Sequence, residues 1–94
     1  MNKRETAMIV ARVNAIENRS LSDTVVETWH ELIGHLSYEH ALEALRIVAS
    51  ETPDTIKPAH ILRAQPAARA EIERRERRAS TQQAIARARR AIEQ

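Results

Sequence analysis

The chain contains a single glycine, Gly34, in 94 residues. Folds of several strands joined by tight turns need more glycine and more β-branched residues than this sequence offers. Alanine, arginine, glutamate and glutamine are abundant instead, and all four favour helices. Aromatic residues make up only 2% of the chain, so the expected core is thin and aliphatic. We therefore predict an all-α fold, a small three- to four-helix bundle.

The first two predicted helices have recognisable ends. The first covers about residues 3–18, with Asn2 and Glu5 at capping-box spacing. The second begins after Ser22, or at Thr24, and ends at Gly34, where we expect the left-handed conformation that commonly terminates a helix. Their apolar stripes are predicted to contain Ile9, Val13 and Ile16 in the first helix, and Val25, Trp29, Leu32 and Ile33 in the second.

The third predicted helix is capped by Ser37 and has the clearest amphipathic pattern in the chain. Its apolar stripe is predicted to contain Ala41, Leu42, Leu45, Val48 and Ala49, and its outward face Glu39, Glu43 and Arg46. A short fourth helix is expected to start at Pro58, because proline is well tolerated in a first turn. Pro66 is then expected to interrupt or restart it.

The charge of the chain is unevenly distributed. Residues 1–56 carry five Lys/Arg and nine Asp/Glu, a net charge of −4, whereas residues 57–94 carry ten and four, a net charge of +6. Such asymmetry suggests an acidic domain joined to a basic segment. We predict a helical bundle domain at 1–65 and a basic Ala/Arg-rich arm at 66–94 that is either a long helix or partly disordered.

The arm holds the best functional candidates. Its few large apolar residues and its arginines are predicted to contact a partner together: Ile72, Arg74, Arg75, Arg77, Arg78, Ile85, Arg87, Arg89 and Arg90. Three interpretations remain open, namely a solvated helical face with Glu–Arg pairs, docking on an acidic protein surface, and contact with phosphates. Because no aromatic residue is interleaved, stacking on single-stranded bases is unsupported.

Several other functions have little support in the sequence. The chain has no cysteine, and its histidines at positions 30, 35 and 40 are five residues apart, which does not suit a helical metal site. It lacks a glycine-rich phosphate loop, and its serines are explained as caps and solvated positions, so we expect no enzyme activity and no cofactor. The third helix is too acidic for the recognition helix of a helix-turn-helix.

No apolar run approaches the roughly 20 residues of a membrane span, and the first residues do not resemble a secretory signal. We therefore expect no membrane association and a cytoplasmic location.

Residues 24–45, TVVETWHELIGHLSYEHALEAL, followed by Pro58-Ala59-His60-Ile61, resemble the phage replicative-helicase loader family. That family has a Trp-His/Tyr-Glu-Leu-Leu-Gly stretch, then a Tyr/Phe-x-x-Ala-x-x-Ala-Leu helix, and later a Pro-Ala/Thr-x-Ile segment. The resemblance covers about residues 6–63. It implies a small helical N-terminal bundle, a C-terminal part that engages the hexameric replicative helicase, and an initiator or single-strand-binding protein as further partners.

The expected function is therefore that of a non-enzymatic phage or prophage DNA-replication adaptor that binds, modulates or delivers the replicative helicase. The alternative is a small nucleic-acid-binding regulatory protein that uses the basic arm. A third hypothesis, self-association through the long C-terminal helices, is weaker, because Ile85 and Ile92 form only a thin stripe.

Overall fold

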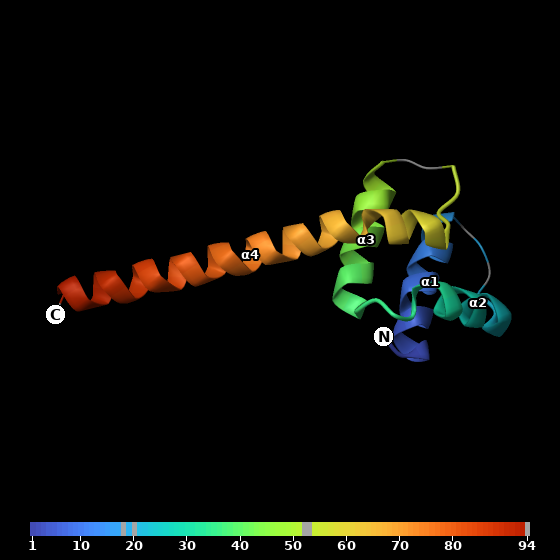
Figure 1. Cartoon of the computed structure of the whole chain (residues 1–94), viewed down its shortest axis with the longest axis horizontal. Coiled ribbons are helices and arrows are strands. Elements are labelled where there is room, and N and C mark those ends of the chain that lie inside the picture. The colour runs from blue at the N-terminus through green and yellow to red at the C-terminus, as the bar shows by residue number, and fades with distance from the viewer. Residues whose placement is uncertain (18, 20, 52–53, 94) are drawn as a thin grey trace.

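The structure, a computed structural model, describes residues 1–17, 19, 21–51 and 54–93, and this part of the chain contains four α-helices and no strand. The helices are α1 (Lys3–Glu17), α2 (Asp23–Ile33), α3 (Tyr38–Ser50) and α4 (Pro58–Glu93). The first three helices and the start of α4 form a bundle, from which the rest of α4 projects as a single helix (Figure 1). The molecule therefore measures 60 × 27 × 21 Å. This architecture confirms the predicted all-α fold with a long C-terminal helix.

Local hydrogen bonds explain where the helices begin. The Asn2 amide N–H donates to the Glu5 carboxylate at 3.0 Å, and the Glu5 N–H donates back to Asn2 Oδ1 at 2.8 Å, which is the predicted capping box. Ser22, rather than Thr24, caps α2 by accepting from the Val25 N–H. Ser37 caps α3 in the same way by accepting from the His40 N–H at 3.1 Å.

Gly34 ends α2 for a different reason from the one predicted. Its φ of −60° and ψ of −21° are right-handed helical values, so the expected left-handed cap is wrong. The constraint on this position is space, because a Cβ atom there would meet the His30 backbone oxygen and lie 2.8 Å from the His30 ring. Glycine thus lets the imidazole of His30 fold over the end of its own helix.

The bundle core is aliphatic with one aromatic anchor. Trp29 is buried in it, as predicted. Core members come from all four helices, from the turn between α2 and α3 and from the loop before α4: Ile9, Val10, Val13, Trp29, Ile33, Leu36, Ala41, Ala44, Leu45, Val48, Ile56, Ile61 and Ala68. The Ile56 backbone N–H also donates to the Glu17 carboxylate, which ties that loop to the end of α1.

Two predicted core residues are exposed. Ile16 in α1 and Leu32 in α2 both face solvent, which corrects the predicted stripes. In α1 the buried face also includes Val10 and Asn14, so it is rotated toward them relative to the predicted stripe, and Ile16 lies at its edge. In α2 the buried residues are Trp29 and Ile33, and Leu32 lies on the flank of that pair. Periodicity predicted the helices correctly, but it did not define how each was rotated against its neighbours.

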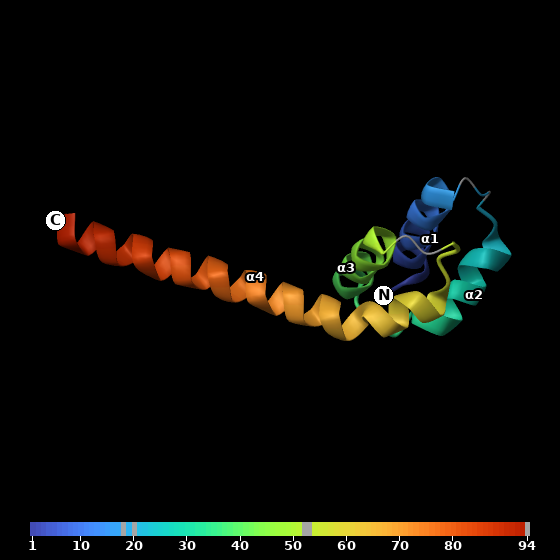
Figure 2. The same cartoon turned by 90° about the horizontal axis from the view of Figure 1, so that it is seen from above.

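The fourth helix runs unbroken through Pro66, which corrects the prediction of an interruption or restart. Pro66 has no N–H to donate to the carbonyl of Leu62, and both residues are exposed, so water can satisfy that carbonyl. The helix bends gently in its first third, the part that contains Pro66 (Figure 2). The expected domain boundary at 65/66 thus lies inside one helix, and Ala68 and Ile72 beyond it are buried.

Candidate partner-binding arm

The helix α4 leaves the bundle at a network of ion pairs, which we call the junction cluster (Glu43, Arg46, Glu71, Arg74, Arg75 and Arg78). Its centre is Glu43 of α3, whose side chain is only 8% exposed. The guanidinium of Arg75 donates to both oxygens of that carboxylate, at 2.9 and 3.2 Å, across 32 positions of sequence. Arg46 donates to the same carboxylate at 3.2 Å. Glu43 is therefore fixed by two arginines, one from its own helix and one from α4.

The sequence pattern placed Glu43 on the outward face of the third helix, and that prediction is wrong. The helix α3 is also covered by α4, which approaches it at His40, 3.5 Å from the Gln65 amide, and at Ile47, which lines a pocket together with residues of α4. Glu43 lies under this second contact. A buried carboxylate is costly unless it is paired, which explains the two-pronged contact with Arg75. That contact, with its Coulomb attraction, raises the pKa of Arg75 above its already high ordinary value.

The second carboxylate of the junction cluster is Glu71 on α4. Arg74 contacts it at 2.6 Å, Arg75 at 3.3 Å and Arg78 at 3.4 Å. The hydrogen bond from Arg74, aided by the positive charges of all three arginines, holds the pKa of Glu71 below its ordinary value of 4.5. Three of the arginines predicted to contact a partner are thus engaged within the chain. Only Arg75 joins α4 to another helix, because Arg74 and Arg78 pair with Glu71 of their own helix.

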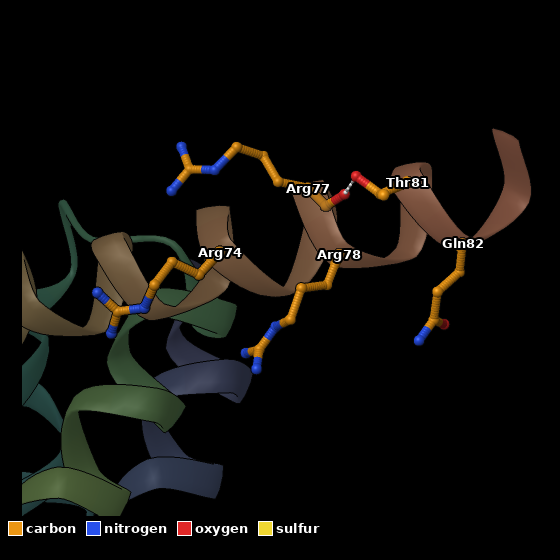
Figure 3. Close-up of a pocket in the computed structure, with 5 residues that line it drawn as sticks. All are labelled: Arg74, Arg77, Arg78, Thr81 and Gln82. Atoms are coloured by element: carbon orange, nitrogen blue, oxygen red, sulfur yellow. Dashed lines mark hydrogen bonds between the residues drawn. The ribbon is translucent and has the colours of Figure 1, made fainter. Parts of the chain in front are cut away.

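At the outer end of the junction cluster, the helix surface forms a shallow pocket of about 390 Å³ lined by Arg74, Arg77, Arg78, Thr81 and Gln82. Figure 3 shows Arg74, Arg78 and Gln82 extending to one side of the helix and Arg77 to the other. The Thr81 hydroxyl donates to the Arg77 carbonyl at 2.9 Å. Arg74 and Arg78 already pair with Glu71, so Arg77 is the one lining arginine without an ion-pair partner among the described residues.

The remainder of the helix, residues 76–93, is the outer arm. None of its residues is buried. Arg77, Arg87, Arg89 and Arg90 have no ion-pair partner in the described part of the chain. With five arginines and two glutamates, this segment carries a net charge of +3. Ile85 and Ile92 are 49% and 84% exposed.

Ile72 differs from the other predicted partner-binding residues. Its side chain is only 6% exposed, because it lies on the part of α4 that packs against the bundle. Little of its surface is left for a partner. The predicted set therefore divides in two. Engaged within the chain are Ile72, Arg74, Arg75 and Arg78, whereas Arg77, Ile85, Arg87, Arg89 and Arg90 are displayed on the arm.

The histidines have structural neighbours. His30 Nδ1 lies 2.8 Å from the hydroxyl of Thr6, which is fully buried. His60 Nδ1 accepts from the Lys57 N–H at the start of α4, and His40 Nδ1 lies 3.5 Å from the Gln65 amide. Among the described residues, no three His, Cys, Asp or Glu side chains are grouped closely enough to hold a metal ion.

Residues 1–17, 19, 21–51 and 54–93 include no helix long and apolar enough to cross a membrane.

No protein-family model, curated protein or solved structure matches this chain.

Sequence reasoning missed Glu43 as a key residue of the site. A usable signal was present, since His40, Ala44 and Ile47 form a second stripe at helical spacing beside the first. A helix with two such stripes is covered on two sides, and an acidic residue at the edge of the second stripe, about 40° from Ile47, requires a basic partner.

Proposed function

We propose that this chain is a non-enzymatic adaptor of phage or prophage DNA replication that binds the replicative helicase and modulates or delivers it. The observation that carries the proposal is the outer arm, a helix held at its base and free of the bundle along its length. The resemblance of residues 24–45 and 58–61 to helicase loaders directs the proposal to this partner.

The arrangement suits an adaptor because the residues that hold α4 on the bundle are different from those available to contact a partner. The bundle and the junction cluster fix the base of α4, and the 18 residues of the outer arm then span about 27 Å at 1.5 Å per residue. A partner that binds there meets a helix whose first turns are already ordered, so less conformational entropy is lost on binding. An initiator or single-strand-binding protein is a further partner in this proposal.

The test is capture of the replicative helicase from a nuclease-treated lysate of a phage host, with its identity established by mass spectrometry. Two baits are compared, the full chain and a chain that ends at Arg78. Ending at Arg78 keeps Ile72 and the junction cluster, whereas ending at residue 65 would remove the buried Ala68 and Ile72. Equal cooperativity of unfolding in both baits is the control for folding.

We expect the full chain to recover the helicase and the shortened chain to recover little of it. Equal recovery by both baits would contradict a role for the outer arm beyond Arg78. Failure of the full chain to recover the helicase would contradict the adaptor proposal itself.

Four arginines of the outer arm, which have no ion-pair partner among the residues that the structure describes, favour a second candidate function, binding of nucleic acid through phosphates. If all four contacted a single strand, the logarithm of affinity would fall with the logarithm of salt concentration with a slope of about −3. We would measure this slope with a fluorescent oligonucleotide, and an affinity independent of salt would exclude this candidate.

A further inference from the structure

The end of the outer arm carries an apolar face with nothing from the described chain packed on it. Successive residues of a helix are about 100° apart, so the five apolar side chains of this face fall within about 120° of the circumference. We call it the terminal apolar face, and its members are Ala84, Ile85, Ala88, Ala91 and Ile92. All five are exposed. Ile92, at 84% exposed, is the most exposed of the chain's large apolar residues.

Arginines lie along both edges of this face. Arg87 is about 40° from Ala91 on one edge, and Arg89 is about 40° from Ile85 on the other. Arg90 lies about 160° from the centre of the face, on the opposite side of the helix. None of the three has an ion-pair partner among the described residues. The face therefore combines an apolar centre with two positive edges.

This charge pattern selects the kind of helix that can cover the face. A second copy of the chain would bring its own arginine edges against these, in either orientation, and like charges at such positions are destabilising. Two isoleucines per chain contribute too little apolar surface to offset that repulsion. A helix with an apolar stripe bordered by Asp or Glu meets both requirements, because it covers the isoleucines and pairs with the arginines.

We propose that the terminal apolar face docks an acidic amphipathic helix of a partner protein. The small side chains of Ala84, Ala88 and Ala91 allow the two helices to approach closely, while Ile85 and Ile92 insert between the partner's apolar residues. Arg87 and Arg89 then pair with carboxylates on the two borders of the partner's stripe. The proposal deepens the adaptor function, since it rests on a partner-binding arm and defines the chemistry that the partner must present.

The first test uses a synthetic peptide of about three heptads, with leucine at the a and d positions and glutamate beside them. The full-length chain is titrated with this peptide while its backbone amide resonances are followed by NMR. We expect shifts concentrated in residues 84–92. The control is a second peptide in which lysine replaces each glutamate. We expect it to cause no such shifts.

Variants of the chain then separate apolar docking from simple charge attraction. Replacing both isoleucines, Ile85→Ala and Ile92→Ala, is expected to weaken binding of the acidic peptide by roughly tenfold or more. The double substitution Arg87→Gln and Arg89→Gln is expected to weaken it about two- to fivefold. Arg90→Gln removes one arginine charge from the opposite side of the helix and is expected to weaken binding of the acidic peptide by less than about twofold. Alanine and glutamine favour helices, so none of these variants should unfold the arm.

Four results would overturn the proposal: no shifts at about 1 mM acidic peptide, equal binding of the lysine peptide, full affinity in the double-alanine variant, or a dimer of the chain that this variant abolishes. An oligothymidylate that shifts residues 84–92 equally in the wild type and in the double-alanine variant would also overturn it, in favour of nucleic acid.

The peptide titration does not involve the helicase, so the two proposals fail separately. Peptide binding without helicase capture would contradict only the adaptor function. Helicase capture that survives Ile85→Ala and Ile92→Ala would contradict only the docking face.

Discussion

Glu43 is the residue on which the direction of α4 most depends. Its carboxylate is almost fully covered and accepts hydrogen bonds from Arg46 and Arg75. Replacing it by glutamine keeps the shape of the side chain but removes the charge that both arginines contact. We expect Glu43→Gln to lower the free energy of unfolding by about 1–2 kcal/mol, as measured by urea denaturation.

Glu76→Gln is the matched control for this substitution. Glu76 is exposed on α4, and no described residue pairs with it in an ion pair. Its replacement is expected to change the free energy of unfolding by less than about 0.5 kcal/mol. Equal effects of the two substitutions would contradict the role assigned to Glu43.

Glu71 gives the junction cluster a dependence on pH. Its pKa is lower in the folded chain than the ordinary value of 4.5, chiefly because Arg74 donates to it. Its contribution to the free energy of unfolding is therefore complete above about pH 4.5 and is lost as the pH falls through the lowered value. We expect the free energy of unfolding to fall less steeply below that pH in Glu71→Gln than in the wild type, as followed by urea denaturation at a series of pH values. Superimposable pH profiles of the variant and the wild type would contradict this assignment.

At the scale of elements, α4 explains how a helix with little apolar surface stays ordered. An isolated helix of 18 residues is marginal in water, because the first turn is costly to form. In this chain the first turns of α4 are held by Ile61, Ala68 and Ile72 in the bundle, so the outer arm only has to extend an existing helix. Its five alanines, five arginines and two glutamines favour that extension.

Pro66 weakens the same helix near its base. Restoring the N–H by Pro66→Ala allows a hydrogen bond to the Leu62 carbonyl and removes the clash of the proline ring. We expect the free energy of unfolding to rise by about 1–2 kcal/mol, less than the full cost of an interior proline because the helix already accommodates it by bending. Pro58→Ala in the first turn is the control and should have little effect. A loss of stability in Pro66→Ala would mean that the packing of α4 requires the bend.

The sequence predicts an element well when neighbouring residues define it, and poorly when residues distant in sequence define it. The caps formed by Asn2 and Ser37 and the start of a helix at Pro58 depend on a few neighbouring residues, and the sequence predicted them correctly. The exposure of Glu43 was predicted wrongly because α4 covers it. The effect of Pro66 was predicted wrongly because the packing of α4 on the bundle keeps the helix continuous around it. In the candidate site, the sequence did not predict that Arg75 is engaged by Glu43 or that Ile72 is buried. The first contact joins residues 32 positions apart, which local patterns do not connect.

At the scale of the whole molecule, the outer arm determines the shape. The Cα radius of gyration is 17.6 Å, whereas a compact chain of this length has a value of about 12 Å. The difference comes from α4, which carries its C-terminal end far from the bundle (Figures 1 and 2). An adaptor that presents a helix to a partner requires this extended shape in the free protein.

Small-angle X-ray scattering of the full-length chain, extrapolated to zero concentration, tests this claim most directly. We predict a radius of gyration near 17.6 Å, a maximum dimension near 60 Å and the mass of one chain. A radius near 12 Å would mean that the arm folds back on the bundle, and the terminal apolar face would then not be displayed. Such a result would contradict the account of the arm as a free binding element.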